Sequence, residues 1–189
     1  MGPVMSPIAR RQDSLLVVID VQERLFAAMN ADGRDQVARN VPILVRAARQ
    51  LEVPIVVTQQ YPRGLGPTVP PVREALEGLD APLDKLVFSV WRDEAIRDAI
   101  ARTKRRSVVL CGIEAHVCVL QSAVDLCEAG YTVHVCADAV TSRHPANHAT
   151  ALDAMRQRGV WVVSTEIVVF GWLERAGTDA FRAVSRLVR

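Results

Sequence analysis

The sequence predicts an α/β fold: one domain built on a doubly wound, Rossmann-like sheet of six mostly parallel strands, with helices on both faces. Two observations carry this prediction. Short runs of β-branched residues alternate along the chain with segments of helical spacing, which is the order of elements that builds a parallel sheet. The runs are apolar almost throughout rather than at every second position, as strands covered on both faces require.

Five strands are predicted from runs bounded by turn or cap residues, at 15–20, 54–59, 107–112, 132–138 and 160–165. A sixth falls within 82–88, where periodicity allows an end at Lys85 or further on. Helical spacing marks the segments 35–51, 93–103, 115–129 and 145–158. The tail 176–189 predicts a short amphipathic helix. The Gly- and Pro-rich stretch 61–71 predicts a long loop after the second strand, where open α/β sheets bind ligands.

Composition is that of a globular protein, with 50% hydrophobic and 23% charged residues in 189. We expect an N-terminal extension, 1–13, and one domain, 14–189. A net charge of +2 gives no electrostatic reason to expect nucleic acid or an anionic membrane as a partner. No apolar run approaches the roughly 20 residues of a membrane span, and no secretory signal is evident. Four cysteines without a C-x-x-C pair predict reduced thiols and a cytoplasmic location.

The strongest local signal is VVLCGIEAHVCVLQSAVDLCEAGY, a strand, a Gly-containing turn and a helix whose first turn holds Cys118. The unpaired N–H groups and positive dipole of a helix N-terminus lower a thiol pKa, so Cys118 is a candidate nucleophile. Cys111 and Cys136 lie inside apolar strands, and Cys127 faces the opposite side of the helix. The alternative is that Cys118 is a small buried apolar residue, and the segment alone does not decide.

Two charged residues are candidates for the same site. Asp20 ends the first predicted strand, where a carboxylate lies at the mouth of the site in this architecture, although a turn cap is the better reading of Asp20 alone. Lys85 lies just before an apolar run, and its local sequence is that of an ordinary surface lysine. Lys85 is therefore a candidate site residue only in combination with Asp20 and Cys118.

Three motifs in order, LLVVIDVQERLF, DKLVFSVW and VVLCGIEAHVCVLQSAVDLCEAGYTVHVCADAVTSR, resemble the isochorismatase-like cysteine hydrolase superfamily, whose members include nicotinamidases and N-carbamoyl amidases. VTQQYPRGLGPTVP and AGTDAFRAVSRLV further resemble its subgroup of isochorismatase domain-containing hydrolases. The resemblance covers about residues 14–188. It implies a catalytic Asp20, Lys85 and Cys118, backbone oxyanion donors at Glu114 and Cys118, and a cis peptide between Ile113 and Glu114. It also implies a third strand ending near Lys85 and a homo-oligomer.

The function that this resemblance implies is hydrolysis of a small amide or ureide C–N bond through a thioester on Cys118. Asp20 would act as the base and Lys85 would favour both the carboxylate and the thiolate. Because Lys85 is assigned to tuning charge, we expect the fold to survive its removal. One alternative is isochorismatase-type cleavage of a vinyl-ether C–O bond, against which the presence of Cys118 counts. Another is a non-catalytic binding or scaffold protein, against which the intact triad counts.

Five further residues are tentative pocket walls for a small-molecule substrate, by their place on loops near the site: Gln22, Phe26, Tyr61, Trp91 and His116.

We expect no metal and no cofactor. Nicotinamidases supply an Asp and two His ligands after the second strand, where this chain reads VTQQYPR. His144 and His148 have i, i+4 spacing but no accompanying glutamate or third ligand, and Gly64 and Gly66 lack the rest of a dinucleotide fingerprint.

Overall fold

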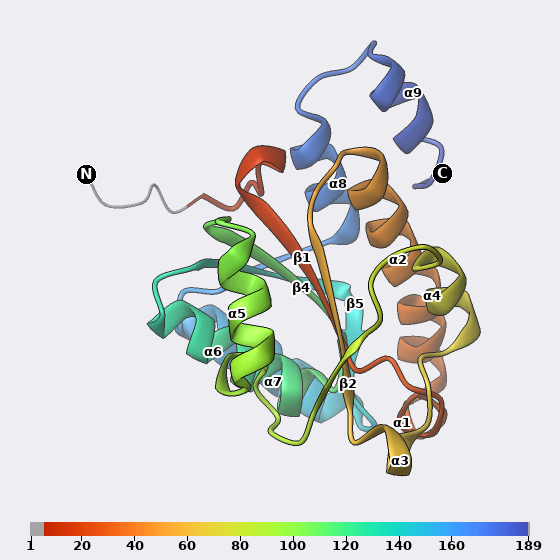
Figure 1. The fold of residues 1–189 in the computed structure, drawn as a ribbon, viewed down its shortest axis with the longest axis vertical. Coiled ribbons are helices and arrows are strands. Elements are labelled where there is room, and N and C mark those ends of the chain that lie inside the picture. The colour runs from red at the N-terminus through yellow and green to blue at the C-terminus, as the bar shows by residue number, and fades with distance from the viewer. Residues whose placement is uncertain (1–5, 189) are drawn as a thin grey trace.

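The computed structural model describes residues 6–188, which form a six-stranded, all-parallel sheet in the order β3-β2-β1-β4-β5-β6 (Figure 1). The strands are β1 Ser14–Ile19, β2 Ile55–Gln60, β3 Leu83–Lys85, β4 Ser107–Ile113, β5 Thr132–Thr141 and β6 Trp161–Val163. The predicted fold class is therefore confirmed, and β3 ends at Lys85. Part of the predicted extension 1–13, residues 1–5, lies outside the described residues, as does residue 189. No helix of the described chain has the length and apolarity to cross a membrane.

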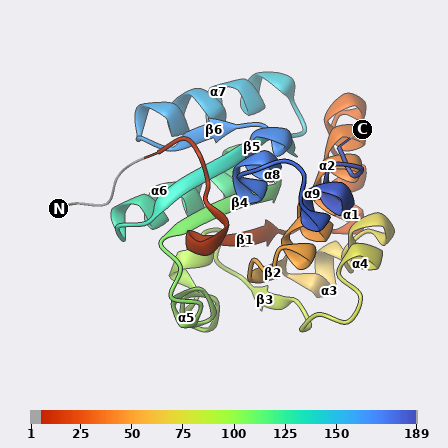
Figure 2. The same ribbon diagram turned by 90° about the horizontal axis from the view of Figure 1, so that it is seen from above.

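Helices cover both faces of the sheet, as Figure 2 shows from above. On one face lie α2 (Ala31–Gln50), α4 (Pro70–Ala75), α8 (Thr165–Leu173) and α9 (Asp179–Val184). On the other lie α5 (Glu94–Arg102), α6 (Leu120–Glu128) and α7 (Pro145–Gln157). The central strand β1 alternates between the two cores, because Leu16 and Val18 join the first and Leu15, Val17 and Ile19 the second. Because both faces of β1 pack against apolar cores, its sequence is a continuous run of hydrophobic residues.

Capping explains where α2 begins. The structure starts α2 at Ala31 rather than at residue 35, because the Asn30 side chain accepts a hydrogen bond from the Gly33 amide at 2.8 Å. The glycine in the first turn conceals this start in the sequence.

One helix was missed at the C-terminal end of β6. The sequence predicts a strand over 160–165, but β6 ends at Val163 and α8 follows. The Ser164 side chain caps α8, and Asp138 Oδ1 accepts from both the amide (2.7 Å) and the hydroxyl (3.0 Å) of Thr165. The helix TEIVVFGWL is apolar almost all round, so it carries no amphipathic period that could have identified it.

The predicted loop 61–71 is partly helical, and this prediction was wrong in detail. It contains α3 (Pro62–Leu65) and the first turn of α4, and each begins with a proline, which suits the first helical position. A short helix α1 (Glu23–Ala27) also precedes α2. The tail helix α9 was predicted correctly in kind, and its residues Phe181 and Val184 pack on this chain's own core.

A glycine allows the two central strands to approach closely beside Asp20. Gly112 has a φ of 117°, and a Cβ built there would lie 2.0 Å from the carbonyl oxygen of Ile19. Only glycine fits this position, because both the conformation and the contact exclude a side chain. The end of β4 is thereby held against the end of β1.

We expect Gly112→Ala to lower the free energy of unfolding by roughly 3 kcal/mol or more, since the new methyl group meets backbone that cannot yield. Gly130→Ala is the matched control, because Gly130 also has a positive φ of 90° but has nothing within 4 Å of the place that a Cβ would take. That variant measures the conformational cost alone, about 1 kcal/mol. Urea unfolding of both variants tests the difference, and equal losses would contradict the close approach.

Candidate active site

The candidate site lies at the carboxyl ends of the central strands. The chain builds β1, β2 and β3 in one direction and then crosses back to place β4 on the other side of β1, so the sheet reverses its order between β1 and β4. Crevices at such reversal points are where open α/β sheets bind ligands. Asp20 directly follows β1, and the turn that leads to Cys118 directly follows β4.

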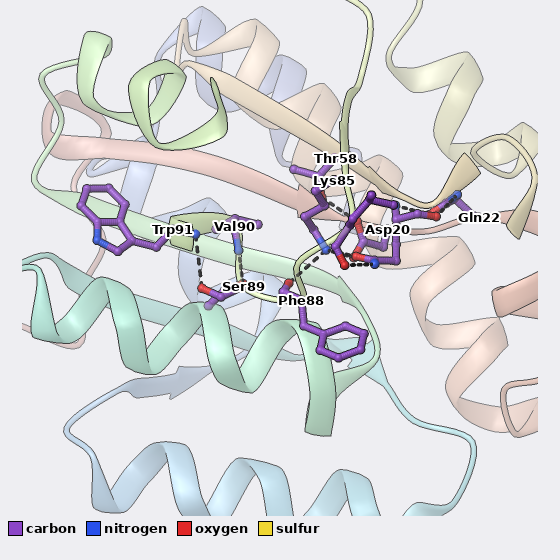
Figure 3. Close-up of polar contacts among 11 residues, drawn as sticks. Asp20, Gln22, Thr58, Lys85, Phe88, Ser89, Val90 and Trp91 are labelled. Atoms are coloured by element: carbon purple, nitrogen blue, oxygen red, sulfur yellow. Dashed lines mark hydrogen bonds and ion pairs between the residues drawn. The ribbon is translucent and has the colours of Figure 1, made fainter. Parts of the chain in front are cut away.

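Asp20 and Lys85 form a buried ion pair (Figure 3). Lys85 Nζ lies 2.6 Å from Asp20 Oδ2, and neither side chain is exposed. The other carboxylate oxygen, Oδ1, accepts from the hydroxyl of Thr58 at 2.7 Å, while the Asp20 amide donates to the Thr58 carbonyl at 3.2 Å. Thr58 on β2 therefore fixes the aspartate through both its backbone and its side chain.

Lys85 is not the surface residue that its local sequence suggests, since it is only 2% exposed. Its ammonium donates to three acceptors: Asp20, the side-chain oxygen of Gln60 at 2.7 Å and the carbonyl of Phe88 at 3.0 Å. A buried charge without partners would be strongly unfavourable, so these bonds are what allow the lysine to stay charged inside the protein.

Sequence reasoning missed Thr58 and Gln60 as site residues. Both lie near the C-terminal end of β2, next to Asp20 on one neighbouring strand and Lys85 on the other. A polar Thr-Gln-Gln end to an apolar strand, at the edge where the candidate carboxylate also lies, was the available signal.

Cys118 lies in a π-helical turn, η3 (Ala115–Val119), that leads into α6. Turns of this kind are frequent at functional sites. The residue is 4% exposed. The pKa of the Cys118 thiol is raised to about 12, chiefly by burial and also by the nearby Asp20 carboxylate, although Lys85 acts to lower it. The expectation of a thiol pKa lowered by the helix N-terminus is therefore corrected: desolvation and the carboxylate outweigh the lysine.

A pH series checks this correction. Below its pKa a thiol gains about tenfold in thiolate per pH unit, so we expect Cys118 alkylation by iodoacetamide to rise about tenfold per unit between pH 7 and 10. Removing Cys127, which is half-buried on the following helix α6, by Cys127→Ala simplifies the mass spectrometry. An alkylation rate that does not change with pH below pH 8 would show that the Cys118 thiol is already ionised there, as its predicted place at a helix N-terminus suggests.

The turn between β4 and η3 contains a cis peptide bond between Ile113 and Glu114. The Glu114 carbonyl accepts from the amides of Val117 and Val119, at 3.1 and 3.2 Å. The buried Glu114 carboxylate forms an ion pair with Arg143, at 3.0 Å, on the segment that follows β5. The backbone of this turn is thus fixed from both ends.

The tentative pocket residues lie in different surroundings in the structure. Tyr61 is 51% exposed and lines an open groove of about 470 Å³ beside Lys85. His116 accompanies the Cys118 turn and contacts the Ser142 hydroxyl at 2.9 Å. Phe26 packs against the core under α2.

Two of the tentative pocket residues, Gln22 and Trp91, do not line a pocket at the site. Gln22 is buried, and its side-chain amide accepts from the Gln60 N–H and donates to the Gln60 carbonyl. Trp91 lies away from Asp20 (Figure 3) and stacks edge-on against Tyr131, at 5.4 Å, near the start of β5. Tyr131 precedes the amino end of its strand, so Trp91 does not reach the carboxyl-end site.

Within residues 6–188 no three His, Cys, Asp or Glu side chains are grouped so as to hold a metal ion. Gln60, in the segment where nicotinamidases carry ligands, has its side-chain oxygen bonded to the Lys85 ammonium, so it does not fit a metal site.

Comparisons with known proteins identify the family of this chain. The isochorismatase domain model matches residues 14–167. The secreted isochorismatase effector Isc1 of Phytophthora sojae is 41% identical over 181 residues, covering 93% of this chain and 84% of the relative. Isochorismatase domain-containing protein 2 of Pongo abelii is 38% identical over 177 residues, covering 93% and 83%. The solved structure of MAR1 ribonuclease from Caenorhabditis elegans superimposes with a TM-score of 0.86 at 35% identity, covering 95% and 91%. The chain belongs to the isochorismatase-like hydrolase superfamily.

Proposed function

We propose that this hydrolase cleaves the C–N bond of a small amide or ureide through a thioester on Cys118. The observation that carries the proposal is the buried Asp20–Lys85 ion pair, at 2.6 Å, whose two charges both act on the Cys118 thiol. A base, a cation and a nucleophile within one desolvated site are the parts that covalent acyl transfer needs.

In the first half of the reaction, Asp20 takes the proton from the Cys118 thiol as sulfur attacks the substrate carbonyl carbon. Because the thiol pKa is high in the free protein, the proton leaves only as the S–C bond forms and the negative charge passes to the carbonyl oxygen. The backbone N–H groups of Glu114 and Cys118 are the proposed donors to that oxyanion, each contributing roughly a hundredfold or more in rate. Asp20 then protonates the leaving nitrogen as the C–N bond breaks.

In the second half, Asp20 deprotonates a water molecule that attacks the thioester carbonyl. The C–S bond breaks, the acid product leaves, and the proton returns to sulfur. Lys85 stays charged throughout and keeps Asp20 available as a base.

The test is a hydrolysis screen over small amides, ureides and carbamates, with intact-mass analysis to detect an acyl group on Cys118. Cys118→Ala should abolish both turnover and the acyl adduct, whereas Cys127→Ala, which removes a second thiol on the following helix α6, should change neither. We also expect EDTA to leave turnover unchanged and elemental analysis to find no stoichiometric metal. Turnover that survives Cys118→Ala would refute the proposal.

The name of the Phytophthora sojae relative favours a second candidate, cleavage of the vinyl-ether C–O bond of isochorismate. That reaction needs no thiol nucleophile, so isochorismate turnover by Cys118→Ala would support it. Including RNA in the screen tests the activity named for the Caenorhabditis elegans protein.

We further propose a homo-oligomer located in the cytoplasm. Three successive apolar side chains beside the site, Leu86, Val87 and Phe88, are exposed, which supports self-association. Light scattering of wild-type protein and of Leu86→Asp, with Leu79→Asp at another exposed leucine as control, tests the assembly. Four cysteines without a disulfide support the reducing compartment, which cell fractionation tests.

A further inference from the structure

The hydrogen bonds of Lys85 use all of its donors. An ammonium has three N–H groups, and the three acceptors are a carboxylate oxygen of Asp20, the carbonyl of Phe88 and the side-chain oxygen of Gln60. Lys85 therefore has no proton left to direct at a substrate. Its influence is electrostatic and depends on where these acceptors hold it.

The Gln60 amide can face Lys85 in only one way. Its oxygen accepts from the ammonium at 2.7 Å, and its NH₂ donates to the Leu86 carbonyl at 2.8 Å. Turning the amide over would set NH₂ against the ammonium and oxygen against the carbonyl, and both contacts would be repulsive. A carboxylate of the same shape would satisfy the lysine but would repel the Leu86 carbonyl.

The backbone of Gln60 is also fixed. The Gln22 side chain accepts from the Gln60 amide at 2.7 Å and donates to the Gln60 carbonyl at 3.0 Å. Gln60 pairs with Lys85 in the β2–β3 ladder, so the two residues are neighbours in the sheet as well. Both Gln22 and Gln60 are buried. The amide is therefore held in position before any substrate arrives.

We propose that Gln60 is a positioning residue: its neutral amide holds the Lys85 ammonium against Asp20 without competing for its charge. This inference rests on the proposed function, since it assigns Gln60 to the same site. In the described chain the charged groups that act on the Cys118 thiol are Asp20, at the end of β1, and Lys85, at the end of β3. A second carboxylate at position 60 would offset the lysine charge that acts on the thiol.

The test compares Gln60→Glu and Gln60→Met with Gln59→Glu. Gln59 is the matched control, because it is the next residue on β2 and its side chain donates to Thr68 instead of contacting Lys85. The readout is the rate of Cys118 alkylation by neutral iodoacetamide between pH 7 and 10, in a Cys127→Ala background. We expect Gln60→Glu to slow alkylation about tenfold at each pH, Gln60→Met about threefold, and Gln59→Glu less than twofold.

Thermal unfolding of the same variants separates positioning from folding, because a purely structural role would lower Tm without changing the alkylation rate at a given pH. Once a substrate is identified, kcat should fall with little change in KM. Unchanged alkylation in both Gln60 variants, together with slower alkylation in Lys85→Met, would overturn the role of Gln60 and leave the proposed function standing. Unchanged alkylation in Lys85→Met as well would overturn both.

Discussion

Asp20→Asn is expected to reduce turnover about 10²- to 10⁴-fold and at the same time to speed the alkylation of Cys118. The loss of turnover follows because an amide cannot accept the thiol proton or give it to the leaving group. The gain in alkylation follows because the Asp20 carboxylate raises the pKa of the Cys118 thiol, so removing that charge favours the thiolate. Steady-state kinetics and timed mass spectrometry at pH 8 measure the two effects.

The two expected effects of Asp20→Asn have opposite signs, because turnover falls while the rate of Cys118 alkylation rises. A variant that had merely closed the site would lose both activities, whereas unfolding would expose the thiol and also speed alkylation, so thermal unfolding must show that Asp20→Asn is folded. Thr58→Val, which removes the hydroxyl bond to Asp20 while keeping its charge, is the control. We expect Thr58→Val to reduce turnover less than Asp20→Asn does. Slower alkylation in folded Asp20→Asn would contradict the assigned electrostatics.

Lys85→Met is expected to lower the free energy of unfolding by about 3 to 5 kcal/mol as well as to impair turnover. The ion pair is fully buried, so removing the cation leaves the Asp20 carboxylate desolvated with only Thr58 to stabilise it. For a domain of this size the loss corresponds to a Tm lower by roughly 6 to 20 °C, measurable by calorimetry. The sequence-based expectation that Lys85 could be removed without affecting the fold is thereby reversed.

A double variant supplies the control. Lys85→Met with Asp20→Asn removes both charges, so stability should largely return while turnover stays lost. A single variant as stable as the wild type at pH 8 would mean that the pair is solvated.

The fold was predictable where a strand's own residues determine it. Continuous β-branched runs located β1, β2 and β4 to within a residue or so, because these strands are buried on both faces. β5 extends three residues beyond its predicted end, because a register shift opposite Leu110 and Gly112 lets it continue past Asp138. The helix α8 was missed because tertiary burial, rather than a helical period, sets its composition.

The resemblance of three sequence motifs to a known family suggested Asp20, Lys85 and Cys118 as members of the candidate site, but the sequence did not suggest the residues around them. Asp20 and Lys85 have ordinary local sequences and were singled out by their motifs, whereas the role proposed for Gln60 depends on a contact with a neighbouring strand. The direction of the Cys118 pKa shift was mispredicted for a similar reason. A local rule about helix ends applied to the sequence, but desolvation depends on the packed core around the thiol.

The groups that hold the ion pair sit at strand ends, and this has an evolutionary consequence. Asp20 follows β1, Thr58 and Gln60 lie in the last three residues of β2, and Lys85 ends β3. Ladder hydrogen bonds set the spacing of these adjacent strands. The segment 61–69, which leaves β2, can therefore change in length and composition more freely than 86–88, because the Leu86 and Phe88 carbonyls hold Gln60 and Lys85. We expect descendants of such a chain to diverge in what they bind while inheriting the same chemistry, so engineered loop exchange between relatives should transfer substrate preference and leave the proposed acylation step intact.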